Sequence, residues 1–235
     1  MTRTLPHLFR LDSSAATGIR AGCTSIGHYG DKGCELADRT GDQRSNPPHR
    51  SAHDWLTDAR DVDQAVYGAI ARTPTPTLDR GMGALSHAAN HSLLWMTSAA
   101  AIALVGGHTG RRAAAQGLGS VAVTSAVVNL AVKRVGRRQR PDRAGEDVPI
   151  ARHVRMPTSL SFPSGHSAAA FAFATGVGNK LPIVAFPLHA LAGVVAYSRV
   201  HTGVHHPSDV VVGSVLGTVL AQLTTRALDR HQETR

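Results

Sequence analysis

The chain has 235 residues, which is enough for one domain with additional segments. Its formal net charge of +9 favours an anionic partner, such as nucleic acid, acidic lipid head groups or a phosphorylated substrate. Only 4% of the residues are aromatic, which argues against a protein that stacks on nucleic-acid bases. The two cysteines, Cys23 and Cys34, are too few for a disulfide framework or a zinc site, so we expect two ordinary thiols.

The N-terminal part of the chain divides into two segments. Residues 1–53 are polar and lack apolar periodicity, so we expect them to be largely disordered. Met1–Arg20 also lack the apolar stretch of ~7–15 residues that a signal peptide needs, so none is predicted. In residues 54–90, apolar side chains recur at helical spacing, and the Thr73–Pro76 stretch separates two amphipathic helices. We expect these helices to lie at a membrane interface or beside the core.

The chain becomes strongly apolar after His91, and residues 91–230 are expected to form the core domain. Five helices are predicted there, at about 92–106, 114–132, 166–179, 182–198 and 208–226. Each is about as long as, or shorter than, the ~20 residues that cross a bilayer. The predicted fold is therefore all-α, a membrane-embedded bundle of five to six core helices with amphipathic N-terminal helices. A soluble bundle with fully buried helices is the alternative.

The connections between these helices differ in length. The stretches ‘GGHTGRR’ and ‘GNKLP’ are expected to be tight turns. The stretch from Lys133 to Pro163 is long, charged and bounded by proline. Long loops in a compact domain are often functional. Three clusters of polar residues lie at helix ends, two of them at the borders of this loop.

The first cluster is basic and includes Lys133 and Arg140. These residues are seven positions apart, which is two turns if the helix persists, so both side chains could point toward one anion. An arginine offers forked donors that match phosphate oxygens, and a lysine offers a point charge. The alternative is a basic flank of a membrane helix, which is common beside membranes.

The second cluster is Pro163–His166, which precedes an alanine-rich helix. Ser164 at the N-cap and the Gly165 amide would expose backbone N–H groups, and such helix starts bind anions. His166 would then lie in the first turn beside the same anion. The alternative is a simple helix cap followed by an unrelated histidine.

The third cluster contains Arg199, His205 and Asp209. Asp209 follows His205 by four residues at the start of a helix, so its carboxylate can reach back to the imidazole. Such a carboxylate fixes the tautomer and raises the nucleophilicity of the other ring nitrogen. The alternative is that Ser208 only caps the helix and Asp209 only complements its dipole.

The three clusters are expected to meet in space. Helices joined by short turns alternate in direction, so the four helix ends that carry these residues fall on one face of the bundle. Two histidines, three cationic side chains and a helix N-terminus would converge there. Such a set has the groups of a reaction centre for an anionic substrate.

The sequence resembles the type 2 phosphatidic acid phosphatase superfamily. That family has a three-part signature, and this chain matches it with Lys-(six)-Arg-Pro, Pro-Ser-Gly-His and Ser-Arg-(five)-His-(three)-Asp, from Lys133 to Asp209. The resemblance implies that His205 is a nucleophile forming a phosphohistidine, that Asp209 orients it and that His166 protonates the leaving oxygen. It also implies phosphate binding by a further set of residues, namely Lys133, Arg140, Ser164, Gly165 and Arg199. It implies neither metal nor cofactor, and it places His201 in a supporting or rim position.

The resemblance implies a metal-independent phosphatase of a lipid phosphate or pyrophosphate, of the phosphatidic acid or polyprenyl phosphate type. The expected partners are this lipid and the membrane, and no nucleic acid. There are two alternatives, a soluble acid phosphatase and a non-enzymatic basic membrane protein that binds acidic lipids. A vanadium haloperoxidase is less expected, because such enzymes have a larger chain. The resemblance also implies a multi-pass protein of the cell membrane with an extracytoplasmic active site. The positive-inside rule does not decide this orientation, because the loops on the two sides of the membrane carry equal numbers of basic residues once the two proposed phosphate ligands are set aside.

Overall fold

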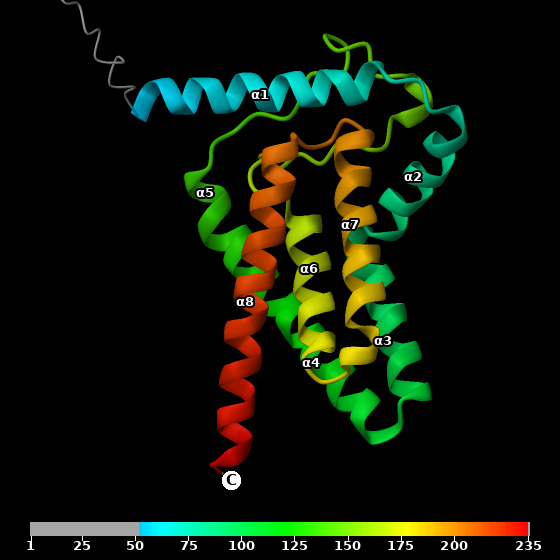
Figure 1. The fold of residues 1–235 in the computed structure, drawn as a ribbon, viewed down its shortest axis with the longest axis vertical. Helices are drawn as coiled ribbons and strands as arrows, with labels where there is room; N and C mark the ends of the chain where they lie inside the picture. The colour runs from blue at the N-terminus through cyan, green and yellow to red at the C-terminus, as the bar shows by residue number, and fades with distance from the viewer. Residues whose placement is uncertain (1–51, 235) are drawn as a thin grey trace, which may run out of the picture. The chain divides into compact units, whose positions relative to one another are not determined.

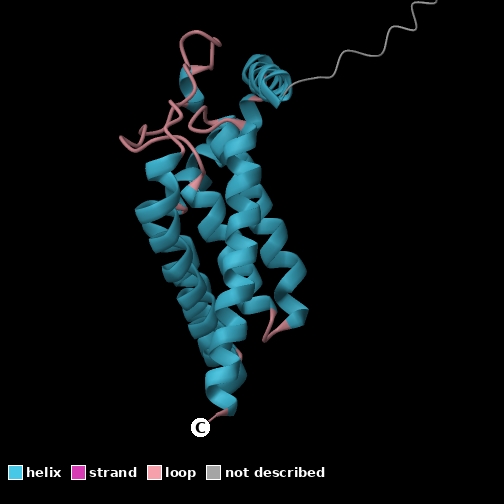
Figure 2. Ribbon diagram, turned by 90° about the vertical axis from the view of Figure 1, so that its left-hand side faces the viewer, coloured by secondary structure: helices cyan, strands magenta, loops and turns pink. Residues whose placement is uncertain are grey.

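The computed structural model describes residues 52–234, and this part of the chain contains helices and loops without a strand. The predicted all-α class is therefore confirmed. Disorder was expected for residues 1–53, and residues 1–51 of that segment, with both cysteines, lie outside the described residues. Residues 52 and 53 are described and belong to the first helix. The long loops gather at one end of the molecule (Figure 2).

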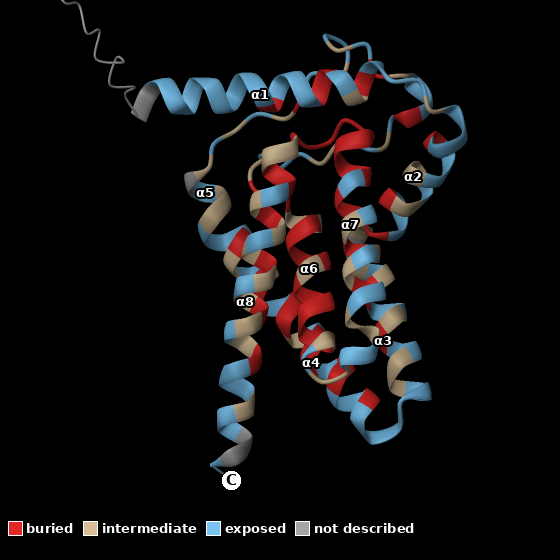
Figure 3. Cartoon of the chain, in the orientation of Figure 1, coloured by how far each residue is buried: buried red, intermediate tan, exposed pale blue. Residues whose placement is uncertain are grey.

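The bundle is built around one central helix. Its members are α3 (Leu93–Val105), α4 (Gly107–Val127), α6 (Gly165–Gly178), α7 (Ala185–His201) and α8 (Pro207–Glu233). The central helix α6 packs against α4, α7 and α8, and it is almost entirely buried (Figure 3). A Cβ atom at Gly217 would lie 2.1 Å from the carbonyl oxygen of Ala168, so α8 approaches α6 closely only because no side chain intervenes.

The helix α4 does not end in a regular turn. It continues through a π-helical segment (Val128–Val132) into a single turn, α5 (Lys133–Val135). The chain then leaves the helix at Gly136 and crosses the end of the bundle as a long loop before α6 begins. π-Helical turns are rare and occur often at functional sites.

Two amphipathic helices precede the bundle, α1 (Ala52–Arg72) and α2 (Pro76–Ala88). Pro76 occupies the first turn of α2, where its missing N–H is not needed for a helical hydrogen bond. The helix α1 lies across the end of the bundle beside α7 and α8 (Figure 1). Its Trp55 and Leu56 are exposed.

Three helices in the described part of the chain are long and apolar enough to cross a membrane. They cover Gly107–Val132, Pro182–His201 and Pro207–His231. The helices α2 and α3 together form a fourth candidate, a span bent by 76°. The central α6 has 14 residues, which is short of the ~20 that span a bilayer, and it is shielded by its neighbours.

Several predicted helix ends were wrong. The stretch ‘GGHTGRR’ is not a loop, because α4 begins at Gly107, where a φ of 57° turns the chain within one residue. The helix predicted to end at residue 198 continues to His201, and the last helix continues to Glu233. The apolar pattern stops near residue 226, but the backbone stays helical and Lys180 pairs with Asp229 at 2.8 Å.

Candidate active site

The ends of four helices meet below α1. The starts of α6 and α8 and the end of α7 lie at this end of the bundle, and the loop that follows α5 runs across it (Figure 1). The sequence clusters stand at these ends, so the alternation of helix direction brings them to one region. The loop between α7 and α8 is only Thr202–His206, which fixes His205 beside the first turn of α8.

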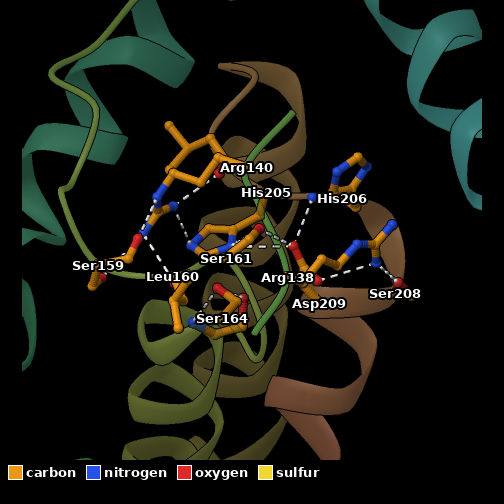
Figure 4. Close-up of polar contacts among 12 residues, drawn as sticks. Arg138, Arg140, Ser159, Leu160, Ser161, Ser164, His205, His206, Ser208 and Asp209 are labelled. Carbon is orange, nitrogen blue, oxygen red and sulfur yellow. Dashed lines mark hydrogen bonds and ion pairs between the residues drawn. The ribbon is translucent and has the colours of Figure 1, made fainter. Parts of the chain in front are cut away.

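His205 is held by Asp209 on one side and by Arg140 on the other (Figure 4). Its Nδ1 atom lies 3.5 Å from the Asp209 carboxylate, and its Nε2 atom lies 3.3 Å from an Arg140 guanidinium nitrogen. A guanidinium only donates hydrogen bonds, so Nε2 is the accepting nitrogen and Nδ1 carries the proton toward Asp209. This tautomer leaves a lone pair on Nε2, which is what a nucleophile requires.

Asp209 is fully buried and has several donors. Its carboxylate accepts a short hydrogen bond from the Ser161 hydroxyl and one of 3.0 Å from the His206 amide. Ser161 also lies 3.4 Å from Nδ1 of His205. Sequence reasoning missed Ser161, because nothing in its local sequence marks it and only the folded loop carries it to Asp209.

Burial sets the protonation state of His205. It lowers the pKa of His205 to about 4; the hydrogen bond that His205 donates to Asp209 opposes this effect, and the nearby charge of Arg140 adds to it. The imidazole is therefore neutral at physiological pH. A neutral imidazole can attack phosphorus, whereas a protonated one has no free lone pair.

Arg140 and Lys133 converge on Ser159. Arg140 donates to the Ser159 carbonyl at 2.9 Å and to its hydroxyl at 3.2 Å, and Lys133 donates to the same hydroxyl at 3.3 Å. The expected mechanism of convergence was wrong, because the helix ends at Val135 and does not persist to Arg140. The loop folds back instead, and Arg140 is fixed by the Val204 carbonyl at 2.9 Å.

Both cations are partly desolvated. Burial, with the charge of Arg140 beside it, lowers the pKa of Lys133, and burial lowers the pKa of Arg140 although Asp209 opposes this effect. Two like charges that are close and poorly hydrated favour a bound anion, because the anion offsets both costs. This arrangement suits a phosphoryl group.

The start of α6 supplies the second histidine. Ser164 is buried, and its hydroxyl accepts from the Ser167 amide at 3.4 Å and from the Ser167 hydroxyl at 2.9 Å, so it caps the helix. A Cβ atom at Gly165 would lie 3.7 Å from the Lys133 ammonium. The ring nitrogen Nε2 of His166 lies 3.1 Å from the Asn90 side-chain oxygen. Asn90, in a 3-10 turn between α2 and α3, was not predicted.

Arg199 is oriented differently from the other predicted cations. It is buried in the last turn of α7, and its guanidinium donates to the carbonyl of Ser86 at 3.2 Å and to the Ser86 hydroxyl. Its Nε atom is buried and has no hydrogen-bond partner among residues 52–234. Its backbone carbonyl accepts from the amides of Val204 and His205, at 3.0 and 3.1 Å, and so anchors the nucleophile's loop.

A second network connects α1 to the active site, and Figure 4 shows its members Arg138, Ser208 and Asp209. Arg138 donates to Asp63 at 2.5 Å, to the Ser208 hydroxyl at 2.6 Å and to Asp209 at 3.2 Å. Asp63 also accepts from the Ser208 amide at 2.7 Å and its hydroxyl at 2.8 Å. Arg138 stands in the basic cluster that the sequence singled out, but Asp63 had no signal beyond its position on an amphipathic helix.

Two cavities flank His166. One, of about 180 Å³, reaches from Lys133 and Gly165 into the bundle. The other, of about 430 Å³, lies under the loop and is lined by Asn90, Arg155 and Ser159, among others. His166 therefore lies between a loop-side opening and a cavity within the helices.

Comparison with known families identifies the family of this chain. Residues 113–233 match the model of the PAP2 superfamily. The chain belongs to the PAP2 superfamily. The family predicted from the three-part signature is thus confirmed, and that signature lies entirely within the matched residues.

The PAP2 relatives with curated names are lipid phosphatases. The decaprenylphosphoryl-5-phosphoribose phosphatase of Mycolicibacterium smegmatis is 38% identical over 164 residues, covering 67% of this chain and 84% of the relative. The enzyme of the same name from Mycobacterium tuberculosis is 35% identical over 157 residues, covering 64% and 81%. The predicted class, a phosphatase of lipid phosphates, is confirmed by these relatives.

Two solved structures share the fold. LpxE of Aquifex aeolicus superposes with a TM-score of 0.57 at 24% identity, covering 70% of this chain and 95% of that one. A transmembrane PAP2-type phosphatidylglycerolphosphate phosphatase of Bacillus subtilis gives a TM-score of 0.56 at 25% identity, covering 74% and 87%. Together with the apolar helices, the transmembrane neighbour from Bacillus subtilis supports membrane association.

Proposed function

We propose that this PAP2 protein removes the terminal phosphate from a polyprenyl-phosphate-linked sugar phosphate. The support is the 35–38% identity to phosphatases named for decaprenylphosphoryl-5-phosphoribose over most of their length. The protein is multi-pass in the cell membrane, and its active site faces the extracytoplasmic side, where α1 lies on the membrane surface.

One observation carries the chemistry, namely the placement of His205 between Asp209 and Arg140. Burial, with the charge of Arg199, lowers the pKa of His166 to about 3, so His166 is neutral in the empty site and takes its proton from the bound phosphate monoanion. The lone pair of Nε2 attacks phosphorus, the bond from phosphorus to the leaving oxygen breaks, and His166 gives that proton to the leaving oxygen. Arg140 leaves Nε2 and binds the phosphoryl oxygens. The product of this step is a phosphohistidine and a free alcohol.

The second step returns the enzyme to its starting state. His166, now neutral, accepts a proton from water while the water oxygen attacks phosphorus. The bond from phosphorus to Nε2 breaks, and the electron pair returns to the imidazole. Inorganic phosphate takes this proton from His166 as it leaves, and His166 is again neutral in the empty site.

The fixed cations supply the electrostatic part of catalysis. Phosphoryl transfer spreads negative charge over the equatorial oxygens, and positioned cations stabilise that charge without reorganisation. Lys133, Arg140 and the unpartnered Nε of Arg199 are the donors, with the amide of Gly165. We propose that these groups take the part that metal ions take in other phosphatases.

The test is phosphate release from a panel of lipid phosphates by the purified protein in detergent. His205→Ala should lower the rate by at least about 10³-fold, because the nucleophile is gone. His189→Ala is the matched control, since that histidine bonds only Thr175 and the Ala185 carbonyl in α7. Radiolabelled substrate should also yield an acid-labile, base-stable phosphoprotein in the native chain and not in His205→Ala. Normal turnover by His205→Ala would remove the assigned nucleophile.

A further inference from the structure

The cavity of about 180 Å³ beside His166 has a wall that the catalytic steps do not use. Its lining includes three groups of the phosphate site, and the remainder consists of small and neutral residues. The full lining is Ala89, Ser92, Ser125, Asn129, Lys133, Gly165, His166 and Ala169. The neutral polar members come from both sides, from the junction of α2 and α3 and from the end of α4.

These neutral side chains have no partner in the described part of the chain. Ser92, Ser125 and Asn129 make no hydrogen bond through their side chains. Other serines in the same helices do: Ser98 bonds the Leu94 carbonyl at 2.8 Å and Ser120 bonds the Gln116 carbonyl at 2.9 Å. Ser92 and Ser125 are half-buried and Asn129 is exposed where the cavity opens, so their polar atoms are accessible to a ligand that enters the cavity.

The backbone around this cavity is also unusual. Asn129 lies in the π-helical segment, one turn after Ser125 and one turn before Lys133, so a polar stripe leads to the phosphate site. Ser92 has a φ of 58°, a left-handed conformation that non-glycine residues rarely adopt. Strained backbone of this kind collects at ligand sites. The π-helical segment and the left-handed Ser92 thus each contribute a polar residue to the lining of the cavity.

We propose that this cavity binds the hydroxyl groups of the leaving alcohol, so that the preferred substrate is a phosphorylated polyol carried by a lipid. This proposal rests on the proposed function, because the leaving oxygen must lie at His166 and the alcohol must therefore begin at the cavity. An acyl or prenyl chain in the same place would leave three polar side chains unpaired. Neutral amide and hydroxyl groups match hydroxyls, and the charged member of the lining, Lys133, is already assigned to the phosphoryl group that is transferred.

The position of Asn129 shows where the lipid anchor of such a substrate can leave the cavity. Asn129 is exposed on the candidate span Gly107–Val132, so the cavity opens at the side of the bundle. The lipid anchor can extend from this opening into the bilayer while the polyol stays beside His166.

The experiment uses two lipids that differ only in hydroxyl groups. Both carry a prenyl-phosphoryl anchor; in one the terminal phosphate is on carbon 5 of a pentose, and in the other on carbon 5 of an n-pentyl chain. Asn129→Leu and Ser125→Ala should each lower kcat/KM for the pentose lipid by about tenfold, which is the loss of about one neutral hydrogen bond. Neither should change kcat/KM for the pentyl lipid by more than about twofold. Ser98→Ala is the control for a serine that does not face the cavity.

The outcomes separate this inference from the proposed function. Equal losses on both lipids, or no loss on the pentose lipid, would overturn the hydroxyl subsite while the phosphatase assignment stands. Failure of the native protein to release phosphate from either lipid would remove the proposed function, and this inference with it. Unchanged inhibition by vanadate, which mimics five-coordinate phosphorus, verifies that each variant keeps its phosphate pocket.

Discussion

Asp63, in the middle of α1, accepts a hydrogen bond of 2.7 Å from the backbone amide of Ser208, the residue before Asp209. An amphipathic helix that was expected at a membrane interface or beside the core thus reaches the first turn of α8. Asp63 is buried, and Arg138 bridges it to the Asp209 carboxylate. The position of α1 and the orientation of the nucleophile are therefore mechanically connected.

Asp63→Asn should weaken this connection. The charged hydrogen bonds to Arg138 and Ser208 are each worth about 1.5–3 kcal/mol, so the thermal midpoint in detergent should fall. A displaced Asp209 should also lower kcat by about 10-fold to 100-fold, with little change in KM. Asp61→Asn, an exposed acid on the same helix, is the control. Unchanged kcat in Asp63→Asn would show that α1 does not position the site.

His166→Ala should expose the role of the leaving group. Without a general acid, the rate for an alkyl phosphate should fall by about 10²–10⁴-fold. A nitrophenyl phosphate ester leaves as a stable anion and needs no proton, so its hydrolysis should be nearly unaffected. Comparison of kcat for the two ester types in native protein and variant measures this difference. Equal losses for both esters would assign His166 to binding and not to proton transfer.

The pH profile should reflect the depressed pKa of His205. An ordinary histidine with a pKa of 6.5 would be mostly protonated at pH 5.5, and the nucleophile would be lost. Burial lowers the pKa of His205 to about 4, so its neutral form persists as the pH falls from 7.5 to 5.5. The enzyme's acid limb in kcat/KM should therefore lie below pH 5. The profile should be measured with two substrates whose phosphate groups have different pKa values. A limb caused by substrate protonation shifts between the two substrates, whereas a limb caused by His205 stays at the same pH.

Arg152 should be a major determinant of stability. It is fully buried, pairs with Asp79 at 2.8 Å and donates to the carbonyls of Ile70 and Thr73 at the end of α1. Arg152→Met leaves Asp79 as a buried charge without its cation, and its remaining contacts are the Thr75 hydroxyl and His201, each at 3.0 Å. The expected loss is about 3–5 kcal/mol, measured by denaturation in detergent. The double variant Arg152→Met with Asp79→Leu should recover part of this loss, and a purely additive double variant would contradict the ion-pair explanation.

Phosphate release should continue in excess chelator. Lys133 and Arg140 already place positive charge where the phosphoryl oxygens would lie, so the transition state needs no metal for charge stabilisation. Rates with chelator and with added Mg²⁺ or Zn²⁺ should agree within about twofold. Loss of activity that returns with a divalent ion would contradict metal independence. Arg140→Lys should lose activity in both conditions, because an ammonium cannot reproduce the forked contacts of the guanidinium.

Local sequence was sufficient to determine the all-helical class, the family and the residues at the helix ends. Apolar periodicity reports burial one segment at a time, and the three-part signature keeps its reactive groups within short stretches such as His205 to Asp209. Because apolar periodicity reports only burial, it also gave wrong helix ends. The helix α8, for example, continues beyond the last residue of its apolar face. It also explains why Arg199 was identified as a cation without any indication that its guanidinium turns toward Ser86.

Only the tertiary structure determined the contacts between residues that are far apart in the chain. Ser161 reaches Asp209, Asn90 reaches His166 and Asp63 reaches Ser208 only because a long loop and two helix junctions fold over the end of the bundle. A single serine, asparagine or aspartate has no periodic pattern that marks its partner. Hydrogen bonds of this kind depend on positions in space to within a few tenths of an ångström, and one sequence does not specify those positions residue by residue.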